Sequence, residues 1–375
     1  MILLLHNTYR VHGGEERAVE DIAWLIPARL GEAVTVIGRD SARTTPQRAA
    51  AGLLHGGLEP ERIGDAVRRS GARVVHAHNV LPSFGWRALA AAREAGARIV
   101  LHLHNYRLVC AVGTCFTHGE DCTRCQGTNT LPGVRLNCRG SRAESAVYAA
   151  ALSRWQDELA AQVDAFVVPS AFALRRLREL RAPLGDRAHV IGSVQRSIAA
   201  RSDAGSGTYA LAAGRLTPEK GFADAVSACV GAGVPLVVAG DGPQAAELRA
   251  LADGADVTFT GRIAPDELAR LRAGAALAIV PSRYQEILPL AALEAMAAGL
   301  PVVAARAGGL VDVISADGLF APGDVAELSE RVAALWGDAD AGRRNLAVAR
   351  ERFSPDAVAA RLARVYGPTG APVTV

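Results

Sequence analysis

Short apolar runs of four to six residues recur along this chain, and segments with helical periodicity lie between them. The runs are almost continuously apolar, which is typical of parallel strands that are buried on both faces of a sheet. Strands that alternate with helices in this way predict doubly wound α/β units. The predicted strands are Ile2–His6, Val34–Ile37, Val74–His78, Ile99–His104 and Ala165–Val168 in a first series, and Tyr209–Ala213, Leu236–Ala239, Val257–Thr260, Leu277–Val280 and Val302–Ala305 in a second.

A polar segment at residues 201–207 separates the two series and is typical of an interdomain linker. Because 375 residues suffice for two domains of ordinary size, we predict an N-terminal domain over residues 1–195 and a C-terminal domain over residues 205–354. The remaining segment, residues 355–375, follows Ser354 and has apolar positions at helical spacing. This pattern predicts a tail helix.

The composition excludes several classes of protein. Half of the residues are hydrophobic and 21% are charged, which excludes global disorder. The formal net charge of +3 gives no reason to expect a nucleic acid partner. No apolar run reaches the roughly 18 residues of a transmembrane helix, and the N-terminus lacks the basic region and cleavage site of a signal peptide. We therefore expect a cytoplasmic protein whose thiols are reduced.

Histidines end three strands of the first series, at the edge where open parallel sheets bind ligands. His6 ends the first strand, His76 and His78 end another, and His102 and His104 end a third. A single histidine there is most simply a hydrogen-bonded core residue. Three strands that bring histidine to one edge instead favour a polar site.

Glycine-containing segments follow the first strand of each series. Gly13-Gly14 precedes a helix, and backbone N–H groups exposed there suit an anion such as a diphosphate, although such a pair is often only a turn. In the second series, residues 214–221 bring Arg215 and Lys220 to the start of a helix that Thr217 is expected to cap. Two cations beside a helix N-terminus predict an anion site, and a solvated basic pair is the alternative.

A longer segment, residues 281–303, contains Glu286 in a loop after a strand and Glu294 inside the helix that follows. A carboxylate on an apolar helix needs a partner, and a ribose diol is a good one. Glu286 and the N–H groups of Ile287 and Leu288 would then face the next part of the same ligand. An exposed glutamate in an alanine-rich helix accounts for Glu294 but not for the whole segment.

Together these segments resemble the family 4 retaining glycosyltransferases of GT-B fold, and the resemblance covers nearly the whole chain. It rests on Glu286-x7-Glu294, on Gly-Arg-Leu-x3-Lys-Gly at residues 214–221 and on Gly13-Gly14. Further matches are Gly240-Asp241-Gly242-Pro243, Phe259-Thr260-Gly261-Arg262-Ile263 and Ala307-Gly308-Gly309. The first half resembles a bacterial subgroup that carries His-Asn-Tyr-Arg-Leu-x-Cys, here residues 104–110.

The resemblance implies two Rossmann-like domains that face a central cleft, with the tail helix crossing back to the first domain. It implies transfer of a sugar from a nucleotide-diphosphate sugar of UDP or GDP type with retained anomeric configuration. The leaving phosphate would assist deprotonation of the acceptor on the same face, so no protein nucleophile is needed. The first domain would lie on the acceptor side, and the second would bind the nucleotide.

The same resemblance assigns roles to residues of this chain. Arg215 and Lys220 would bind the diphosphate and neutralise the leaving group, Glu286 would bind the donor sugar and Glu294 the ribose. His104 would lie beside the reacting sugar, so the expected catalytic residues are His104, Arg215, Lys220 and Glu286. The other expected contacts are Gly13, Gly14, Arg262, Ile263, Ile287 and Leu288 on the donor side, and His12, His78 and Asn105 on the acceptor side. No Asp-x-Asp follows an apolar strand, so we expect catalysis without a metal cofactor.

Five of the six cysteines lie in an inserted segment, residues 108–140. Their pattern has a Cys-x2-Cys pair at its centre and is typical of structural zinc held by four thiolates. The resemblance selects four ligands, which are Cys110, Cys122, Cys125 and Cys138. Cys115 is then spare, and His118 is a weaker alternative ligand. A redox pair or unligated thiols are the alternative to zinc.

Two other functions compete with sugar transfer. A nucleotide-sugar epimerase of GT-B fold would want carboxylates where this chain has strand-end histidines. A non-catalytic nucleotide-sugar-binding module would have no need of the charged residues of the second half. Residues 141–162 predict a packing helix, with peripheral membrane contact as the alternative. The donor sugar, the base, the acceptor (a saccharide, a lipid-linked saccharide or a small metabolite) and the oligomeric state stay open.

Overall fold

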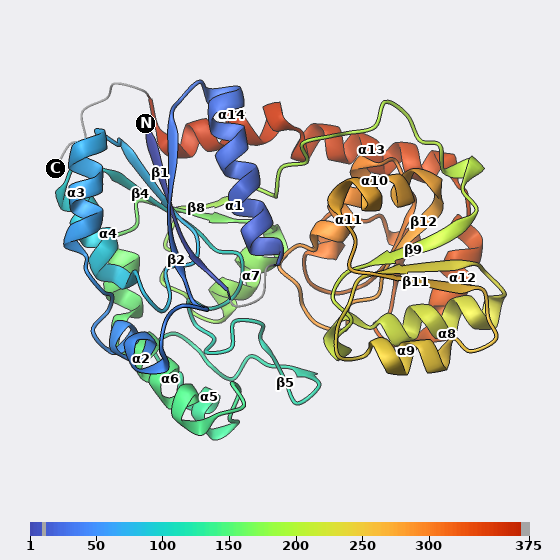
Figure 1. Ribbon diagram of the computed structural model, residues 1–375, viewed down its shortest axis with the longest axis horizontal. Coiled ribbons are helices and arrows are strands. Elements are labelled where there is room, and N and C mark those ends of the chain that lie inside the picture. The colour runs from blue at the N-terminus through green and yellow to red at the C-terminus, as the bar shows by residue number, and fades with distance from the viewer. Residues whose placement is uncertain (10–12, 369–375) are drawn as a thin grey trace. The chain divides into compact units, whose positions relative to one another are not determined.

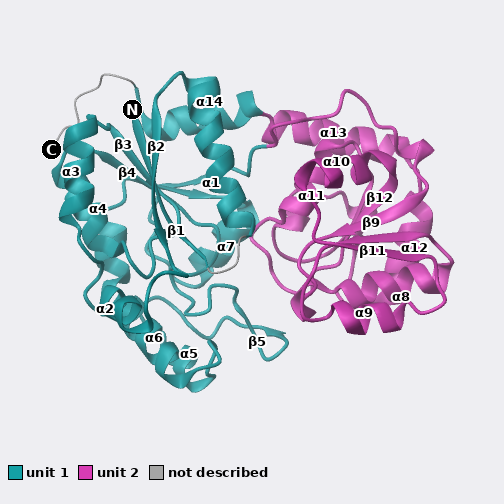
Figure 2. Cartoon of the chain, viewed as in Figure 1, with its two compact units in different colours: residues 1–194, 355–375 teal, residues 195–354 magenta. Residues whose placement is uncertain are grey.

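The computed structural model describes residues 1–9 and 13–368. The chain divides into two compact units, drawn in different colours in Figure 2. The first unit contains residues 1–194 and the chain from Pro355 onward, and the second contains Gln195–Ser354.

The first unit is built on a sheet of six parallel strands in the order β2-β1-β3-β4-β7-β8 (Figure 1). Its strands are β1 (Ile2–Thr8), β2 (Val34–Asp40), β3 (Val74–Ala77), β4 (Arg98–His102), β7 (Ala165–Val168) and β8 (Ala188–Val190). A separate antiparallel pair is formed by β5 (Phe116–Thr117) and β6 (Glu120–Asp121). Its helices are α1 (Gly14–Leu25), η1 (Ile26–Leu30), α2 (Pro46–Leu54), α3 (Glu61–Ser70), α4 (Gly85–Glu94), α5 (Leu131–Arg135), α6 (Arg142–Ala161), α7 (Ala171–Glu179) and α14 (Pro355–Tyr366).

Helices cover both faces of this sheet. Ile2 and Leu4 of β1 pack with α1, η1 and α14 on one face, and α4 packs on β4 with α3 and α6 beside it. Leu3 and Leu5 are also buried, which explains why the run is apolar at every position rather than at alternate ones. The tail helix α14 belongs to the first unit, where Leu362 joins the core, so the chain does cross back.

The second unit repeats the architecture, with six parallel strands in the order β11-β10-β9-β12-β13-β14. Its strands are β9 (Tyr209–Ala213), β10 (Leu236–Ala239), β11 (Val257–Gly261), β12 (Ala275–Val280), β13 (Val302–Ala305) and β14 (Leu319–Phe320). Its helices and short turns are η2 (Ala204–Ser206), η3 (Pro218–Lys220), α8 (Phe222–Ala232), α9 (Ala245–Leu251), α10 (Pro265–Gly274), α11 (Leu290–Ala297), η4 (Gly308–Asp312), η5 (Ala316–Gly318), α12 (Val325–Leu335) and α13 (Ala339–Phe353).

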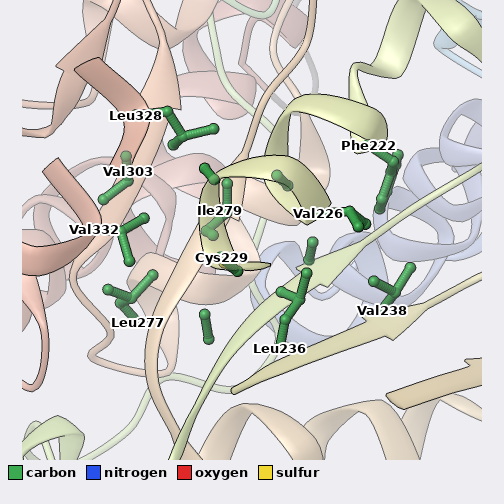
Figure 3. Packing of buried hydrophobic residues seen from close by; sticks show 14 of the residues in the cluster. Phe222, Val226, Cys229, Leu236, Val238, Leu277, Ile279, Val303, Leu328 and Val332 are labelled. Atoms are coloured by element: carbon green, nitrogen blue, oxygen red, sulfur yellow. The ribbon is translucent and has the colours of Figure 1, made fainter. Parts of the chain in front are cut away.

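Two apolar layers sandwich the second sheet. One layer joins α8, α9 and α12 to the sheet, and Figure 3 shows Val226 and Cys229 of α8 above Leu236 of β10, with Ile279 of β12 and Val332 of α12 nearby. The other layer joins α10, α11 and α13 to the opposite face. Small residues in the strands and helices allow these close contacts.

The predicted fold class is confirmed, and each predicted strand corresponds to an observed one. The short edge strands β8 and β14 and the β5–β6 pair were not predicted, because two or three residues carry too little periodicity to be detected. The polar segment at 201–207 lies inside the second unit, which begins at Gln195. Ala204 within that segment is buried, and Thr208 N–H donates to Gly274 O at 3.1 Å, so the segment is packed rather than a free linker.

Helix α6 confirms the predicted helix at 141–162, with Ser141 as its N-cap. Its Trp155 indole donates to Leu54 O at 3.1 Å, and its ring lies 5.7 Å from that of Trp86 on α4. The helix is thus packed on α2 and α4. Among the described residues, no helix combines the length and the hydrophobicity needed to cross a membrane.

Candidate functional site

The second sheet changes its direction of winding at β9. The chain continues from β9 to β10 and β11 on one side, and then returns to β12, β13 and β14 on the other side. The loops that leave the carboxyl ends of β9 and β12 therefore lie at the switch point, which is where open α/β sheets bind ligands. Most of the predicted donor residues belong to these two loops, at residues 214–221 and 281–288.

Lys220 and Glu286, one from each loop, form an ion pair. Lys220 Nζ donates to Glu286 Oε2 at 2.7 Å, and the Ser282 hydroxyl donates to the other carboxylate oxygen. Glu286 is only 7% exposed, so these two partners replace water around its charge. The Tyr284 ring centroid lies 5.4 Å from Lys220 Nζ, which adds a cation–π contact. Lys220 is the only lysine in the chain.

Arg215 directly follows β9 and is exposed. Burial raises the pKa of Tyr284, as does the nearby Glu286 carboxylate, and the charge of Arg215 opposes that rise. Arg215 therefore lies close enough to act on the same group of side chains as Lys220. The structure thus brings together three of the predicted catalytic residues, which are Arg215, Lys220 and Glu286.

The helix expected to begin at Thr217 begins later. Pro218–Lys220 forms a single 3-10 turn, and the Thr217 hydroxyl donates to the side chain two residues ahead instead of capping a helix. Gly221 then adopts a left-handed φ of +69°, and a Cβ there would also collide with the carbonyl oxygen of Pro281, so both observations require glycine at this position. Helix α8 starts only at Phe222, so Lys220 lies just before that helix rather than inside its first turn.

The loop after β13 fixes the position of Glu286. Gly309 N–H donates to Glu286 O at 2.8 Å, and Gly308 N–H donates to Gln285 Oε1 at 2.6 Å. Gly308 has a φ of +57°, and a Cβ there would collide with the backbone of Glu286. Only glycine allows the two loops to approach this closely. The Ala307-Gly308-Gly309 segment is therefore a positioning element for Glu286.

Glu294 has a protein partner. It lies on α11 with its side chain 22% exposed, and Arg272 Nη2 of α10 donates to its carboxylate. The sequence predicted that a carboxylate on this apolar helix needs a partner. An arginine of the same unit is that partner. Because a carboxylate has about four lone-pair sites, Glu294 keeps capacity to accept further hydrogen bonds.

The other predicted donor residues are less tightly grouped. Ile287 is buried and Leu288 half-buried beside Glu286, and Leu288 packs against the layer formed by α10, α11 and α13. Arg262 is exposed just after β11, and Ile263 packs on the same apolar layer. β11 lies two strands from β9, so Arg262 and Ile263 share the carboxyl edge of the sheet with Lys220.

In the first unit, an acidic side chain of α1 accepts hydrogen bonds from backbone N–H groups at and before the start of that helix. Glu16 accepts from Gly13 N–H at 2.8 Å and from Tyr9 N–H at 2.9 Å. Burial alone would raise the pKa of Glu16, but hydrogen bonds from His6, Tyr9 and Gly13 outweigh it and lower the pKa to about 2. A permanent negative charge therefore lies beside the glycines that the sequence suggested for a phosphate. The predicted acceptor-side residue His12 lies outside the described residues.

His104 and Asn105 follow β4 and belong to a polar network that the sequence did not reveal. His104 Nε2 lies 2.8 Å from His78 Nδ1, so two predicted site residues are hydrogen-bonded to one another. Asn105 Nδ2 donates to the Glu15 carboxylate at 3.2 Å and to the Tyr9 hydroxyl at 3.1 Å. Burial raises the pKa of Glu15, against the charge of Arg107.

A cavity of about 60 Å³ lies beside this network. Its polar lining includes Glu15, His78, His104 and Asn105, and its apolar lining comes from α2, α4 and α6. Such a mostly apolar cavity with a few polar groups at one side is typical of small-molecule sites. The predicted acceptor-side residues His78 and Asn105 thus meet the predicted catalytic His104 at a cavity within the first unit.

The five cysteines of the inserted segment surround a second, smaller cavity of about 10 Å³, lined by Cys110, Cys115, Cys122, Cys125 and Cys138 together with apolar residues. A hydrogen bond with Cys115 lowers the pKa of Cys110 to about 6, while burial raises the pKa of Cys125 to about 11. Cys115 thus lies beside Cys110, and the choice of Cys110, Cys122, Cys125 and Cys138 as the four ligands stays a prediction. In the described ranges, the sulfurs do not converge closely enough to form a preformed ligand set.

Sequence reasoning missed four residues, two in the candidate site of each unit. Ser282 and Arg272 bind the two glutamates, and Tyr9 and Arg107 belong to the network around Asn105. Their partners lie between 4 and 98 positions away in the sequence, so no local pattern shows these contacts.

Part of the chain is similar in sequence to known glycosyltransferases. Residues 207–338 match the family model described as "Glycosyl transferases group 1". A sulfoquinovosyl transferase of Arabidopsis thaliana is 43% identical over 105 residues, which cover 26% of this chain and 20% of that protein. A 2-deoxystreptamine glucosyltransferase of Streptomyces kanamyceticus is 37% identical over 137 residues, which cover 33% of this chain and 35% of that protein. The chain thus spans only a minor part of the length of these relatives.

Solved structures match over nearly the whole chain. Sucrose-phosphate synthase from Thermosynechococcus elongatus superposes with a TM-score of 0.70 at 19% identity, covering 97% of this chain and 98% of that one. Anabaena HepE in complex with UDP-glucose superposes with a TM-score of 0.63 at 18% identity, with the same coverage of both chains. These likenesses define a two-domain α/β protein of GT-B fold. The family match itself is confined to residues 207–338, which lie within the second unit.

Proposed function

We propose that this chain is a retaining glycosyltransferase that moves a hexose from a UDP- or GDP-sugar to an acceptor hydroxyl. The observation that carries the proposal is the Lys220–Glu286 ion pair at the switch point of the second sheet. A buried carboxylate and the single lysine of the chain lie at the position where α/β sheets bind nucleotides. The matched relatives named as glycosyltransferases and the UDP-glucose complex of the Anabaena neighbour support a nucleotide-sugar donor.

Lys220 and Arg215 would stabilise the leaving diphosphate. Breaking the bond between the sugar and the phosphate places additional negative charge on the phosphate oxygens, and nearby fixed cations lower the free energy of that state. In the structure without donor, Glu286 binds Lys220. A diphosphate would share or replace that contact, which leaves Glu286 with lone pairs for the donor sugar's hydroxyl groups.

Glu294 would accept hydrogen bonds from the two ribose hydroxyls. Its ion pair with Arg272 holds the carboxylate in place, and its remaining lone pairs are available to accept these hydrogen bonds. Ile287 and Leu288 would contribute backbone N–H groups, and Arg262 and Ile263 would contact the base. Gly13 and Gly14 remain proposed phosphate contacts, but the Glu16 carboxylate beside them makes that role weaker than the roles of Arg215 and Lys220.

The acceptor would enter the first unit beside His104. The cavity there is lined mainly by apolar side chains, with His78 and Asn105 at its polar side. His104 would orient the reacting hydroxyl, and the leaving phosphate would take its proton on the same face, which retains the anomeric configuration. No protein nucleophile and no metal cofactor has a role in this proposal.

We propose in addition that zinc orders the inserted segment. Cys110, Cys122, Cys125 and Cys138 line one small cavity, so the residue types suit a thiolate site, and zinc would draw together sulfurs that are not gathered into a ligand set without it. The lowered pKa of Cys110 favours the thiolate that zinc binds. Bound zinc would supply cross-links in a segment with little core of its own. Metal analysis and thiol titration of protein prepared without chelator test this: zinc that protects thiols of this cluster is expected, and five cluster thiols that all titrate freely would refute it.

A panel of nucleotide-sugars tests the proposed reaction. Release of nucleoside diphosphate that depends on an acceptor hydroxyl is the expected result, with nuclear magnetic resonance of the product showing a retained anomeric configuration. Conversion of the donor without acceptor would instead identify an epimerase. Binding with no turnover across all donors and acceptors would identify a binding module. Inverted product would overturn the proposed stereochemistry while keeping the donor site.

A further inference from the structure

Five histidines of the first unit gather at the carboxyl ends of β1, β3 and β4, and the sugar-transfer proposal uses only two of them. His76 and His102 stack with their rings 5.4 Å apart, and His78 lies 4.4 Å from His76 and 5.3 Å from His102. The register explains the cluster, because β3 and β4 are paired in parallel and each carries histidines on alternate residues of one face.

Besides His6, whose ring lies 3.6 Å from the Glu16 carboxylate, three of these rings have buried nitrogen atoms with no hydrogen-bond partner among the described residues. These atoms are Nε2 of His76, Nε2 of His78, and both Nδ1 and Nε2 of His102. All three side chains are at most 4% exposed. Native proteins rarely leave buried polar atoms unpaired, so this group of orphaned nitrogens calls for an explanation.

We propose that His76, His78 and His102 form a binding site for a divalent transition metal, with zinc as the best match. One ligand nitrogen from each side chain lies within 4.8 Å of the others. Three neutral imidazoles with an open fourth position are an established ligand set for zinc, and imidazole also suits cobalt, nickel and copper. Calcium and magnesium are excluded because they require oxygen ligands.

The outer contacts of two ligands favour one tautomer. His76 Nδ1 lies 2.8 Å from the Tyr366 hydroxyl of α14, and His78 Nδ1 lies 2.8 Å from His104 Nε2. If each Nδ1 carries the proton and donates outward, each Nε2 presents a lone pair to the metal. Partners that hold the second ring nitrogen in this way are typical of histidine ligands in proteins.

The surroundings also suit a cation. The three rings are buried side by side, and neutral imidazole is the form that coordinates a metal ion. Negative charge lies in the next layer, because His6 is edge-on to His78 and within 3.6 Å of the Glu16 carboxylate. His78 and His102 also line the cavity of about 60 Å³, which has room for water as a fourth ligand.

Bound metal would act on His104 through His78. A metal ion on His78 Nε2 fixes the proton on Nδ1, which donates to His104 Nε2. His104 must then carry its own proton on Nδ1, so the metal selects one tautomer of that residue. The metal site itself does not depend on the sugar-transfer proposal, because its ligands and their contacts lie wholly in the first unit.

Cobalt titration of the full chain tests the proposal, because Co²⁺ reports its ligands by absorption. Thiolate ligands give an intense near-ultraviolet charge-transfer band, whereas a site of imidazoles and water gives only the weaker visible bands. We compare the chelator-treated wild type, His102→Leu and, as matched control, His189→Gln at an exposed histidine of β8. The wild type and the control are expected to bind one Co²⁺ more than His102→Leu, with the thiolate band equal in all three.

Equal Co²⁺ stoichiometry in the wild type and His102→Leu would overturn the proposal, as would visible bands that always accompany the thiolate band. Circular dichroism checks that His102→Leu is folded. Tyr366→Phe gives a second, independent measurement, because it keeps every ligand and removes only the hydroxyl that orients His76. Its Co²⁺ affinity is expected to fall about 10- to 100-fold, and unchanged affinity would contradict the assigned role of Tyr366.

Discussion

Lys220 Nζ and Glu286 Oε2 lie 2.7 Å apart although 66 residues separate them in the sequence. The pair joins the loop after β9 to the loop after β12, and Glu286 is nearly excluded from solvent. A buried ion pair is a weak source of stability, because desolvation offsets much of the attraction. Its position at the switch point of the sheet is better explained by function, since the same two charges can be redistributed when a phosphorylated sugar binds.

Replacing Lys220 is therefore expected to slow transfer more than it weakens binding. Lys220→Ala removes one cation from the developing charge of the leaving group, which costs about 2.7–4 kcal/mol of barrier, or roughly 10²- to 10³-fold in kcat. Lys220→Arg keeps the charge and is expected to retain more activity than Lys220→Ala. Steady-state kinetics with saturating donor measure the effect, and an unchanged kcat in Lys220→Ala would remove Lys220 from the mechanism.

The single lysine also allows a chemical test. An amine-selective reagent can modify only Lys220 and the N-terminal amine of this chain. A bound nucleoside diphosphate is expected to protect Lys220 from modification, while the N-terminal amine, which pairs with Glu32 at 3.4 Å, keeps its rate of labelling and serves as internal control. Mass spectrometry of peptides reads both sites. Equal labelling of Lys220 with and without nucleotide would show that the nucleotide binds elsewhere.

Arg272 is expected to affect nucleotide binding although it is not a predicted contact. Arg272→Ala removes the partner of Glu294 and leaves a half-buried carboxylate uncompensated, so affinity for the nucleoside diphosphate should fall by about tenfold or more. Arg270→Ala changes an exposed arginine on the same helix and should leave affinity unchanged. Isothermal titration calorimetry compares the two. Equal affinities would mean that the Glu294–Arg272 pair is purely structural.

Gly308→Ala tests whether the loop after β13 positions Glu286. The new Cβ would collide with the backbone of Glu286, and the left-handed φ of +57° adds strain, so we expect a loss of about 1–3 kcal/mol of stability together with reduced donor affinity. Gly323→Ala is the matched control, since Gly323 has a φ of +83° but open space around it. Loss of donor affinity in both variants, or in neither, would argue against a specific contact between Gly308 and Glu286.

Glu16 is expected to contribute to acid stability. Its pKa of about 2 in the folded chain lies below the unfolded value of about 4.3, so its stabilising contribution is present above about pH 4.3 and is lost as the pH falls towards 2. The difference corresponds to at most about 3 kcal/mol. Glu16→Gln should lower the free energy of unfolding at pH 7 and flatten its pH dependence between about pH 5 and pH 2. Urea unfolding across this range measures both effects, with Glu94→Gln, at an exposed site, as control.

Much of the candidate site could be predicted from the sequence, because each of its loops is defined by a few consecutive residues. The strands, the loops that follow them and the charged residues in those loops are all defined by short patterns such as residues 214–221. The contact partners of the charged side chains could not be predicted from such short patterns. Glu294 called for a partner, but the choice of Arg272 depends on how α10 and α11 pack. Thr217 looked like a helix cap, but the chain forms a 3-10 turn at Pro218–Lys220 and a left-handed Gly221 before α8 begins.

The sequence by itself determined the α/β class, the two series of strands and the edge of each sheet at which polar residues collect. These follow from hydrophobic periodicity and from the direction of parallel strands, which act over a few residues. The tertiary structure alone decided that Lys220 meets Glu286, that Arg272 pairs with Glu294 and that three buried histidines converge. Such contacts join segments that are distant in the sequence. They depend on strand register and helix packing, which are set only when the strands pair in the folded sheet.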